Sequence, residues 1–330
     1  MCYSTPGWRD LKEFTIGAND AGQRLDRFLA KAVPLLPGSL AQKYIRLKRI
    51  KVGSVAVKRD YKLAFGDVLR MYINDEFFEL PGKDNAYLKI SDPMLDIIYE
   101  DNNILLVNKQ AGVLCHSDSA LEYNTVISRV QAYLYQKGEW RSREENAFRP
   151  ALCNRIDRNT SGIVIAAKNA VALRMINDKI KLREIDKYYL AAVHGILTPP
   201  SGMLENHIFK DAVQNRVFIS GDSRPGTKTA VTEYRTIAVA GRLSLLECRL
   251  VTGRTHQVRA QLAAIGHPLL GDGKYGSERL NKPYDEKYQA LCSYKIVFDF
   301  KTNAGILEYL DKCAFQITGI PFVEKFFPNI

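Results

Sequence analysis

Residues 154–167 read NRIDRNTSGIVIAA, a loop of charged and small polar residues that runs directly into an apolar stretch. The apolar stretch predicts a buried strand. A polar loop placed immediately before a buried strand is a common way to present a reactive side chain at the edge of a core. Asp157, with Arg155 and Arg158 close by in sequence, is therefore the first candidate for chemistry. An ordinary turn whose charges face water fits the same residues, so the loop alone does not decide.

Strand and helix patterns surround this loop from Leu95 to about Phe300. Strands are predicted at 95–100, 103–109, 162–168, 187–195, 232–239, 243–251 and 294–300. Helices are predicted at 125–137, 170–183 and 255–265. Because the helices do not alternate strictly with the strands, the pattern favours an α+β fold with a mixed or antiparallel sheet over a doubly wound one.

A second charged segment, 252–262, reads TGRTHQVRAQL. If a helix begins at Thr255, its apolar residues form one buried stripe: Val258, Leu262 and Ile265. Arg259 then lies at the flank of the stripe, and Gly266 ends the helix. A buried arginine needs an anionic partner, and a carboxylate on a neighbouring loop would be held ionised and oriented by it. An exposed arginine is the alternative on this pattern alone.

The first eighty residues have a pattern of their own. A strand candidate at 13–20 precedes a helix predicted at 23–33, whose apolar residues recur at helical spacing: Leu25, Phe28, Leu29 and Ala32. Prolines break this helix. Ser39 is the predicted N-cap of a second helix, in which Ile45 faces inward.

Basic residues concentrate in the second half of this unit. Between residues 43 and 62, eight basic residues against Asp60 alone give +7 of the net charge of +11: Lys43, Arg46, Lys48, Arg49, Lys51, Lys58, Arg59 and Lys62. Short strands predicted at 50–57 and 68–73 interrupt them with apolar residues, so the charges belong to a folded unit. Four of these residues are predicted to lie three and four apart along one helix: Lys43, Arg46, Lys48 and Arg49. The charges indicate a surface for nucleic acid, with a solvated helix face as the alternative.

A polar stretch without periodicity, 79–92, contains Pro81 and Gly82 and predicts an interdomain linker. We therefore predict a small helix–helix–strand domain at 1–80, with its core at about 20–73, a linker at 81–92 and a larger domain at 93–330.

Composition narrows the class of protein. The 330 residues include six scattered cysteines without a CxxC pair, which indicates reduced thiols in a cytoplasmic protein, not disulfides or a zinc site. No apolar stretch approaches the ~20 residues of a membrane span, and the N-terminus lacks a secretory signal. The GxGxxG pattern at 271–276 lacks a strand–turn–helix context, so we predict no dinucleotide. The five histidines are dispersed without a metal-ligand spacing, so we predict no metal, and we predict no other cofactor.

The N-terminal pattern has a known counterpart. Residues 23–33, the basic second helix, 50–58 and 65–73 together resemble an S4 RNA-binding domain. The resemblance implies that the second helix and the adjacent loop contact RNA. It marks five residues as candidate contacts: Lys43, Arg46, Lys48, Arg49 and Lys51.

The larger domain resembles RluA-type pseudouridine synthases. RIDRNTSG at 155–162 resembles the RLDxxTSG motif of that family, whose aspartate is the covalent catalyst, and Asp157 falls on it. KYYLA at 187–191 resembles the K-x-Y-x-A strand and places the active-site tyrosine on Tyr189. Residues 97–116 resemble the opening strands of the same domain.

The third motif of the family is resembled by TGRTHQVR at 252–259, followed by IGHPLLGD. Its last arginine pairs with the catalytic aspartate, which implies a pair between Arg259 and Asp157. Arg155, Arg254 and His256 are candidate RNA contacts from these motifs. The resemblance implies a cofactor-free monomer that acts on large-subunit ribosomal RNA.

Two positions depart from the family pattern. Asn154 stands where the family usually has histidine, and Gln110 stands where it has proline. Neither touches the aspartate, the tyrosine or the arginine, so the departures bear on the subgroup and not on catalysis.

Two other functions fit parts of the sequence. A non-catalytic RNA-binding assembly factor could retain the fold, but a retired site has no need of Asp157, Tyr189 and Arg259 together. A glycoside hydrolase needs two carboxylates flanking the bond, and only Asp157 has such a setting.

Overall fold

The computed structural model describes residues 11–73, 75–78, 86–117, 122–142, 145–211, 213–220, 222–223 and 225–330. The chain divides into two compact units. Unit 1 comprises 1–92, 131–150 and 169–171; unit 2 comprises 93–130, 151–168 and 172–330. Helix α3 (Val126–Gln136) therefore begins in unit 2 and ends in unit 1. The boundaries expected from sequence remain predictions, and residues 79–85 of the expected linker lie outside the described residues.

In the described part of residues 11–92, unit 1 combines the helices α1 and α2 with a four-stranded sheet of order β1-β4-β2-β3. Its elements are β1 (Leu11–Thr15), α1 (Leu25–Ala32), α2 (Gly38–Arg46), β2 (Ile50–Val52), β3 (Val55–Ala56), β4 (Val68–Tyr72), η1 (Asp75–Phe78) and η2 (Ala86–Lys89). Leu25, Phe28 and Leu29 are buried as the helical spacing predicts, in one core with Ile45 and Ile50.

Helix α2 begins earlier than its sequence suggests. The carbonyl of Pro37 accepts the first helical bond, from the backbone N–H of Ala41, at 2.9 Å. Ser39 already lies inside the helix, so the prediction that it is the N-cap is wrong. Pro37 takes that position because its fixed φ suits an extended residue from which a helix can start at once.

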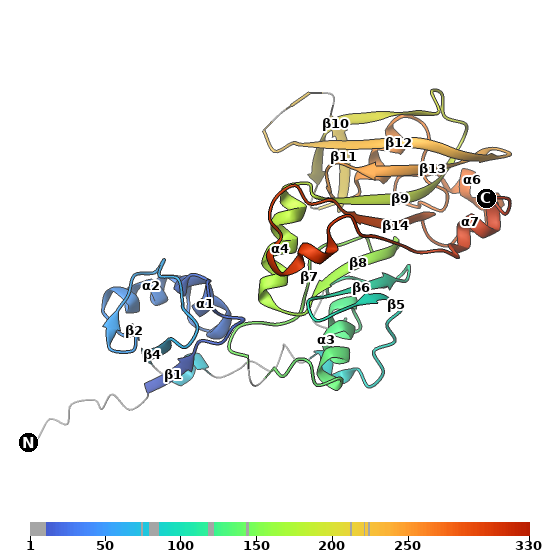
Figure 1. Ribbon diagram of the computed structural model, residues 1–330. Helices are drawn as coiled ribbons and strands as arrows, with labels where there is room; N and C mark the ends of the chain where they lie inside the picture. Colours follow the sequence, from blue (N-terminus) through green and yellow to red (C-terminus); the bar gives the residue numbers. More distant parts are fainter. Residues whose placement is uncertain are drawn as a thin grey trace, which may run out of the picture. The chain divides into compact units, whose positions relative to one another are not determined.

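Unit 2 contains, among the described residues, an eleven-stranded mixed sheet of order β11-β10-β12-β13-β9-β14-β8-β6-β5, with β15 beside β14 and β7 beside β8 (Figure 1). The strands are β5 (Ile97–Glu100), β6 (Ile104–Lys109), β7 (Ala151–Leu152), β8 (Ser161–Ala167), β9 (Ile185–His194), β10 (Ser201–Asp211), β11 (Arg216–Ser220), β12 (Lys228–Ala240), β13 (Leu243–Leu250), β14 (Leu291–Phe298) and β15 (Ala314–Gln316). Strands β8 and β14 run parallel, and the other described pairings are antiparallel. The predicted α+β class is confirmed.

The strand that follows the Asp157 loop lies at the centre of this unit. Ile163 and Ile165 of β8 pack in one core with helix α4 (Ala170–Lys181). Val164, on the opposite face, packs in another core with helix α5 (Gln257–Ala264). Because both faces are covered, β8 is continuously apolar instead of alternating.

Shorter helical segments complete unit 2: α6 (Glu278–Asn281), η3 (Lys282–Tyr284), η4 (Gly305–Leu310) and α7 (Pro321–Phe326). No helix in the described part of the chain is both long and apolar enough to cross a membrane. Five of the six cysteines are described and all five are free thiols; Cys2 lies outside the described residues.

Helix α5 departs from the prediction at both ends. It begins at Gln257, because His256 has a left-handed φ of 52° and cannot belong to the helix. Ile265 is the C-cap and is 43% exposed, so the prediction that it joins the buried stripe is wrong. The backbone leaves the helix there and turns at Gly266, whose φ is 86°. Val258 and Leu262 are buried as predicted.

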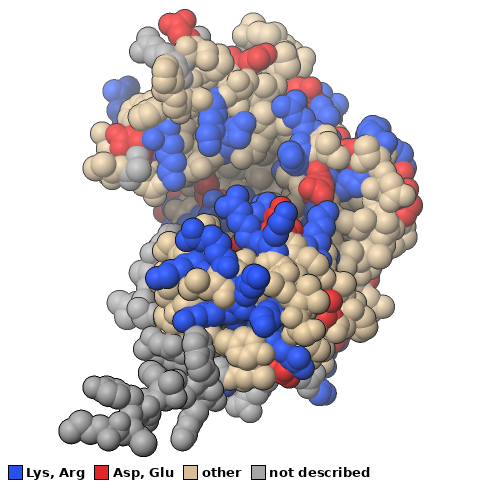
Figure 2. Space-filling view, turned by 90° about the vertical axis from the view of Figure 1, so that its left-hand side faces the viewer, with Lys and Arg blue, Asp and Glu red and all other residues tan. Residues whose placement is uncertain are grey.

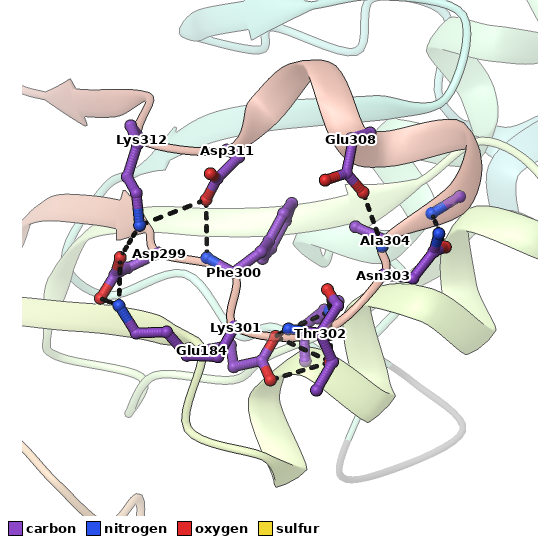
Figure 3. Close-up of polar contacts among 12 residues, drawn as sticks. Glu184, Asp299, Phe300, Lys301, Thr302, Asn303, Ala304, Glu308, Asp311 and Lys312 are labelled. Atoms are coloured by element: carbon purple, nitrogen blue, oxygen red, sulfur yellow. Dashed lines mark hydrogen bonds and ion pairs between the residues drawn. The ribbon is translucent and has the colours of Figure 1, made fainter.

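A buried ion pair between Lys179 and Glu184 lies where the turn between α4 and β9 meets the segment after β14. Figure 3 shows Glu184 in contact with Thr302 of that segment. Lys179 Nζ lies 2.7 Å from Glu184 Oε2, and their side chains are 3% and 4% exposed. The hydroxyl of Thr302 donates to Glu184 at 2.9 Å. Burial opposes the charged carboxylate, but the hydrogen bonds from Lys179 and Thr302 outweigh it and lower the pKa of Glu184 to about 2.

This pair predicts an acid-sensitive contribution to stability. Since the pKa of Glu184 is lowered in the fold, its stabilisation is present above the unfolded value of 4.5 and is lost as pH falls towards about 2. We expect Glu184→Gln to lower the free energy of unfolding at neutral pH by about 3–5 kcal/mol, the usual cost of breaking a buried pair. The loss should shrink as urea unfolding is repeated at lower pH.

The control is Glu286→Gln, which removes a more exposed ion pair with Lys325. Such a pair contributes at most about 1 kcal/mol. Equal urea midpoints for Glu184→Gln and the wild type at neutral pH would contradict this account.

Candidate active site

The loop that carries Asp157 is a tight turn clamped against the sheet. The backbone N–H of Thr160 donates to the carbonyl of Asp157 at 3.1 Å. The hydroxyl of Thr160 accepts a buried hydrogen bond from Gln289 Nε2 at 2.9 Å. Gly162 has a φ of 116°, and a Cβ there would lie 2.4 Å from the carbonyl oxygen of Ser293 on β14. Only glycine permits this approach, so the turn is fixed where β8 begins.

Lys109 holds the same loop from the other side. Its ammonium group is buried and donates to the carbonyls of Gln110, Val113 and Arg158 at 3.0, 2.8 and 2.8 Å. Burial lowers its pKa to about 8. The lysine thus ties the turn after β6 to the residue that follows Asp157, and Gln110 stands in this turn without a proline.

Asn154 acts as a substitute strand partner. Its side-chain Oδ1 accepts a hydrogen bond from the backbone N–H of Ile165 at 2.7 Å, and its Nδ2 donates to the carbonyl of Ile163 at 3.4 Å. Strand β7 ends just before this residue, so the side chain continues the pairing of β8 where the backbone does not. Asparagine supplies both a donor and an acceptor for this purpose.

Arg259 joins two carboxylates. Its Nη1 donates to Asp157 Oδ2 at 2.9 Å, while its Nε and Nη2 donate to the two oxygens of Asp272 at 2.7 and 3.0 Å. The side chains of Arg259, Asp272 and Asp157 are 8%, 0% and 24% exposed. The expected contact between Arg259 and a carboxylate from a neighbouring loop is therefore present. Asp272, which the sequence analysis did not single out, fixes the guanidinium in a bidentate pair.

The charges of this network are maintained against burial. Desolvation disfavours the ionised forms, but the mutual hydrogen bonds prevail, so the pKa of Asp272 is lowered and that of Arg259 is raised. Asp157 gives one oxygen, Oδ2, to Arg259. No hydrogen bond from the described residues reaches its other oxygen, Oδ1, so the carboxylate is oriented and still has an oxygen available for chemistry.

His256 lies against the same carboxylate. Its Nε2 is 3.9 Å from Asp157 Oδ2, and its Nδ1 is 2.9 Å from the hydroxyl of Tyr275. Burial lowers the pKa of His256, which favours the neutral ring at neutral pH. The ring of Tyr275 also lies beneath the guanidinium of Arg259, whose Cζ is 5.2 Å from the centroid of that ring. Tyr275 therefore packs against two of the groups that surround Asp157.

Tyr189 is buried on β9 and lines the same cavity as Asp157. Burial raises the pKa of its hydroxyl well above the usual value. The hydroxyl therefore remains protonated at neutral pH. It can donate a proton or a hydrogen bond, and the ring offers an apolar face.

A cavity of about 760 Å³ brings the predicted residues of unit 2 together: Asp157, Tyr189, Arg259, Arg155, Arg254 and His256 all line it. Its volume is within the usual range for sites that bind small molecules. Arg155 has no hydrogen-bond or ion-pair partner among the described residues, whereas Arg254 Nε donates to the carbonyl of Thr229 at 3.1 Å. No cluster of three potential metal ligands occurs among the residues that the structure describes.

The predicted RNA contacts of unit 1 form a basic surface of different geometry from the one expected. Helix α2 ends at Arg46, and Lys48 has a left-handed φ of 56°. The prediction that Lys43, Arg46, Lys48 and Arg49 follow one helix is therefore wrong, because the chain turns towards β2 after Leu47. Lys48, Arg49, Lys51 and Tyr72 instead line a shallow cavity of about 340 Å³. Figure 2 shows Lys and Arg crowded on the face drawn there, with few acidic side chains among them.

Comparisons with known proteins agree on one family. A family model described as RNA pseudouridylate synthase matches residues 103–264. An uncharacterized RNA pseudouridine synthase of Mycoplasma capricolum is 32% identical over 91% of this chain and 95% of its own length. The ribosomal large subunit pseudouridine synthase C of Vibrio cholerae is 30% identical over 79% of each chain. The solved structure of human RNA pseudouridylate synthase domain containing 1 has a TM-score of 0.51 at 22% identity and covers 68% of this chain and 89% of that one, so the two share the fold.

Proposed function

Because this chain belongs to the family of RNA pseudouridine synthases, which are isomerases, we propose that it modifies uridines of large-subunit ribosomal RNA with Asp157 as its covalent catalyst. The choice of RNA is supported by the similarity to the large-subunit synthase of Vibrio cholerae. One observation carries the choice of Asp157: its carboxylate is held at Oδ2 by Arg259 while Oδ1 has no partner among the described residues, at the wall of the cavity.

The reaction breaks the bond between the ribose and N1 of uracil, turns the base, and joins the same ribose carbon to C5. Asp157 can attack the ribose carbon as N1 leaves with the electron pair, attack the pyrimidine ring, or remove a ribose proton. Either attack gives a covalent intermediate that keeps the pieces together until the carboxylate is released and C5 loses its proton.

The other groups have supporting roles in this proposal. Arg259 orients Asp157 through its Oδ2, and Asp272 fixes Arg259 in turn. Tyr189 stacks on the uracil and provides a protonated hydroxyl for proton transfer. The uridine must leave its stack to reach the cavity. Arg155, which has no partner among the described residues, then fills the space that the uracil leaves in the RNA stack.

Chemical mapping of pseudouridine in ribosomal RNA tests the proposed substrate. Cells that lack the protein should lose pseudouridine at specific large-subunit positions, and wild-type protein should restore them, whereas Asp157→Asn should not. An identical map with and without the protein would contradict this substrate. Restoration by Asp157→Asn would instead favour a non-catalytic assembly factor.

We further propose that the protein acts as a cytoplasmic monomer. Size-exclusion chromatography with light scattering can check the oligomeric state.

We propose that unit 1 is an S4-like domain whose basic surface contacts RNA phosphates without reading bases. Lys43, Arg46 and Lys48 are exposed. No hydrogen bond or ion pair within the described part of the chain engages their side chains. Changing all three to glutamine should flatten the salt dependence of RNA binding by about two log–log units, since each contact with a single strand contributes ~0.7. Turnover of RNA already bound at saturation should not change.

A matched control removes three exposed charges from β1 and α1 of the same unit: Lys12, Arg27 and Lys31. Its salt dependence should remain that of the wild type. A salt slope unchanged by the Lys43, Arg46 and Lys48 substitutions would leave these charges as an ordinary solvated surface.

A further inference from the structure

The cavity extends beyond Asp157 to a basic wall. Lys181 ends helix α4, Arg183 stands in the following turn, and Lys187 lies near the start of β9; all three line the cavity. Lys210 on β10 lines it as well. None of these residues was selected from the sequence as an RNA contact.

The side chains of the basic wall are not bonded directly to any carboxylate among the described residues. Among the described residues, no hydrogen bond or ion pair involves the side chains of Lys181, Arg183 or Lys187. Arg249, which lines the same cavity, differs: it is held by Asp186 at 3.0 Å and by Glu233 at 3.0 Å. The fold therefore neutralises one cation of the cavity and leaves the others available to an anion.

Lys187 is the most informative of the three. It is half-buried, and burial lowers its pKa. Asp186 attracts this ammonium group, but its carboxylate is bonded to Arg249 and not to Lys187. An amine that is withdrawn from water without a directly bonded carboxylate costs stability, so its position suits an anion from outside the chain. Its Nζ lies 3.8 Å from where a Cβ of Gly253 would be, and glycine leaves that side of the ammonium open.

The spacing along β9 suits a nucleotide. Lys187 and Tyr189 are two residues apart and line the same cavity, so their Cα atoms are roughly 6.6 Å apart along one face of the strand. A uracil stacked on Tyr189 would thus have its neighbouring backbone beside Lys187. Arg183 and Lys181 continue the positive charge away from the base.

We propose that Lys187, Arg183 and Lys181 bind the backbone phosphates that adjoin the target uridine. This inference rests on the proposed function and names the part of the substrate that the basic wall recognises. The ligand is single-stranded RNA, bound by charge and not by base identity.

The first test measures binding of a short uridine-containing single-stranded RNA across a salt series. Lys181→Gln combined with Arg183→Gln should lower the log–log salt slope by about 1.4. The loss of affinity relative to the wild type should therefore be about 25-fold larger at ~0.1 M salt than at ~1 M salt. In pseudouridine formation, KM should rise while the single-turnover rate at saturation stays the same. The control is Arg242→Gln combined with Arg279→Gln, two exposed cations of unit 2 outside the cavity, which should alter neither quantity. A wild-type slope for the first double variant would overturn the proposal.

The second test separates ligand binding from a structural role for Lys187. Lys187→Met should weaken RNA binding while leaving the Tm of the free protein unchanged or higher, because it removes an uncompensated charge. A single methylphosphonate, which neutralises one phosphate, should weaken wild-type binding at one position beside the uridine and have no further effect on Lys187→Met. A lower Tm with unchanged RNA affinity would overturn the proposal. Both binding tests are independent of turnover, so they stand even if ribosomal RNA is not the substrate.

Discussion

Changing Asp157 to asparagine should abolish pseudouridine formation, with turnover reduced at least about a thousandfold, on the scale seen when a catalytic nucleophile is removed. Asparagine has nearly the same shape, and its amide oxygen can still accept the hydrogen bond that Arg259 Nη1 now donates at 2.9 Å. The fold and the RNA affinity should therefore stay close to those of the wild type. What is lost is the negatively charged oxygen that attacks the substrate.

The measurement pairs single-turnover pseudouridine formation with RNA binding on the same preparations. The control is Asp186→Asn, which alters a carboxylate that also lines the cavity but is engaged by Arg249. That variant should keep most of its turnover. If Asp157→Asn retains even a tenth of wild-type turnover, Asp157 is not the covalent catalyst.

Arg259→Leu should cause the second large effect, on activity and stability together. The instability should arise at Asp272 more than at Asp157. Asp157 is a quarter exposed and can be solvated, whereas Asp272 is fully buried and would lose a bidentate partner. Removing one member of a buried pair costs about 3–5 kcal/mol. Arg259→Lys should lie between the wild type and Arg259→Leu, since lysine restores the charge but not the planar fork.

A double substitution separates the two effects. Arg259→Leu combined with Asp272→Leu removes both buried charges, so urea unfolding should show much of the stability regained. Turnover should not recover, because Asp157 still lacks the group that orients it. A single Arg259→Leu variant with the wild-type urea midpoint would contradict this account of the network.

The sequence reveals the groups that face the cavity better than the groups that hold them. Asp157, Tyr189 and Arg259 lie in motifs with dense local patterns, and the structure brings all three to one cavity. Asp272 and Gln289 support this cluster from other loops, and nothing local marks Gln289 as a partner. A buried acidic residue between glycines directly after two apolar residues, as in LLGDG at 269–273, was the available signal for Asp272.

The sequence pattern missed strands β10 and β11 for one physical reason. Strands β10 and β11 carry few buried side chains, so their apolar periodicity is weak; Ile208 and Val217 are the buried apolar residues within them. Strands near a sheet edge are held by pairing more than by side-chain burial. In α5 the opposite applies, since Gln257 to Leu262 are all buried. The apolar stripe predicted this helix, but it could not predict that the polar residues of the helix are buried with partners.

The clamp on the Asp157 turn has a consequence for the order in which the enzyme matures. Gln289 and Ser293 follow Asp157 by well over a hundred residues. The side chain of Gln289 nevertheless bonds Thr160, and the backbone of Ser293 lies against Gly162. During synthesis, the catalytic loop therefore leaves the ribosome long before the strand that shapes it. Contacts of such high sequence separation form late because a long stretch of chain must first be closed. A nascent chain ending before Gln289 should lack a competent site, so the enzyme gains its activity only after this strand has been synthesised.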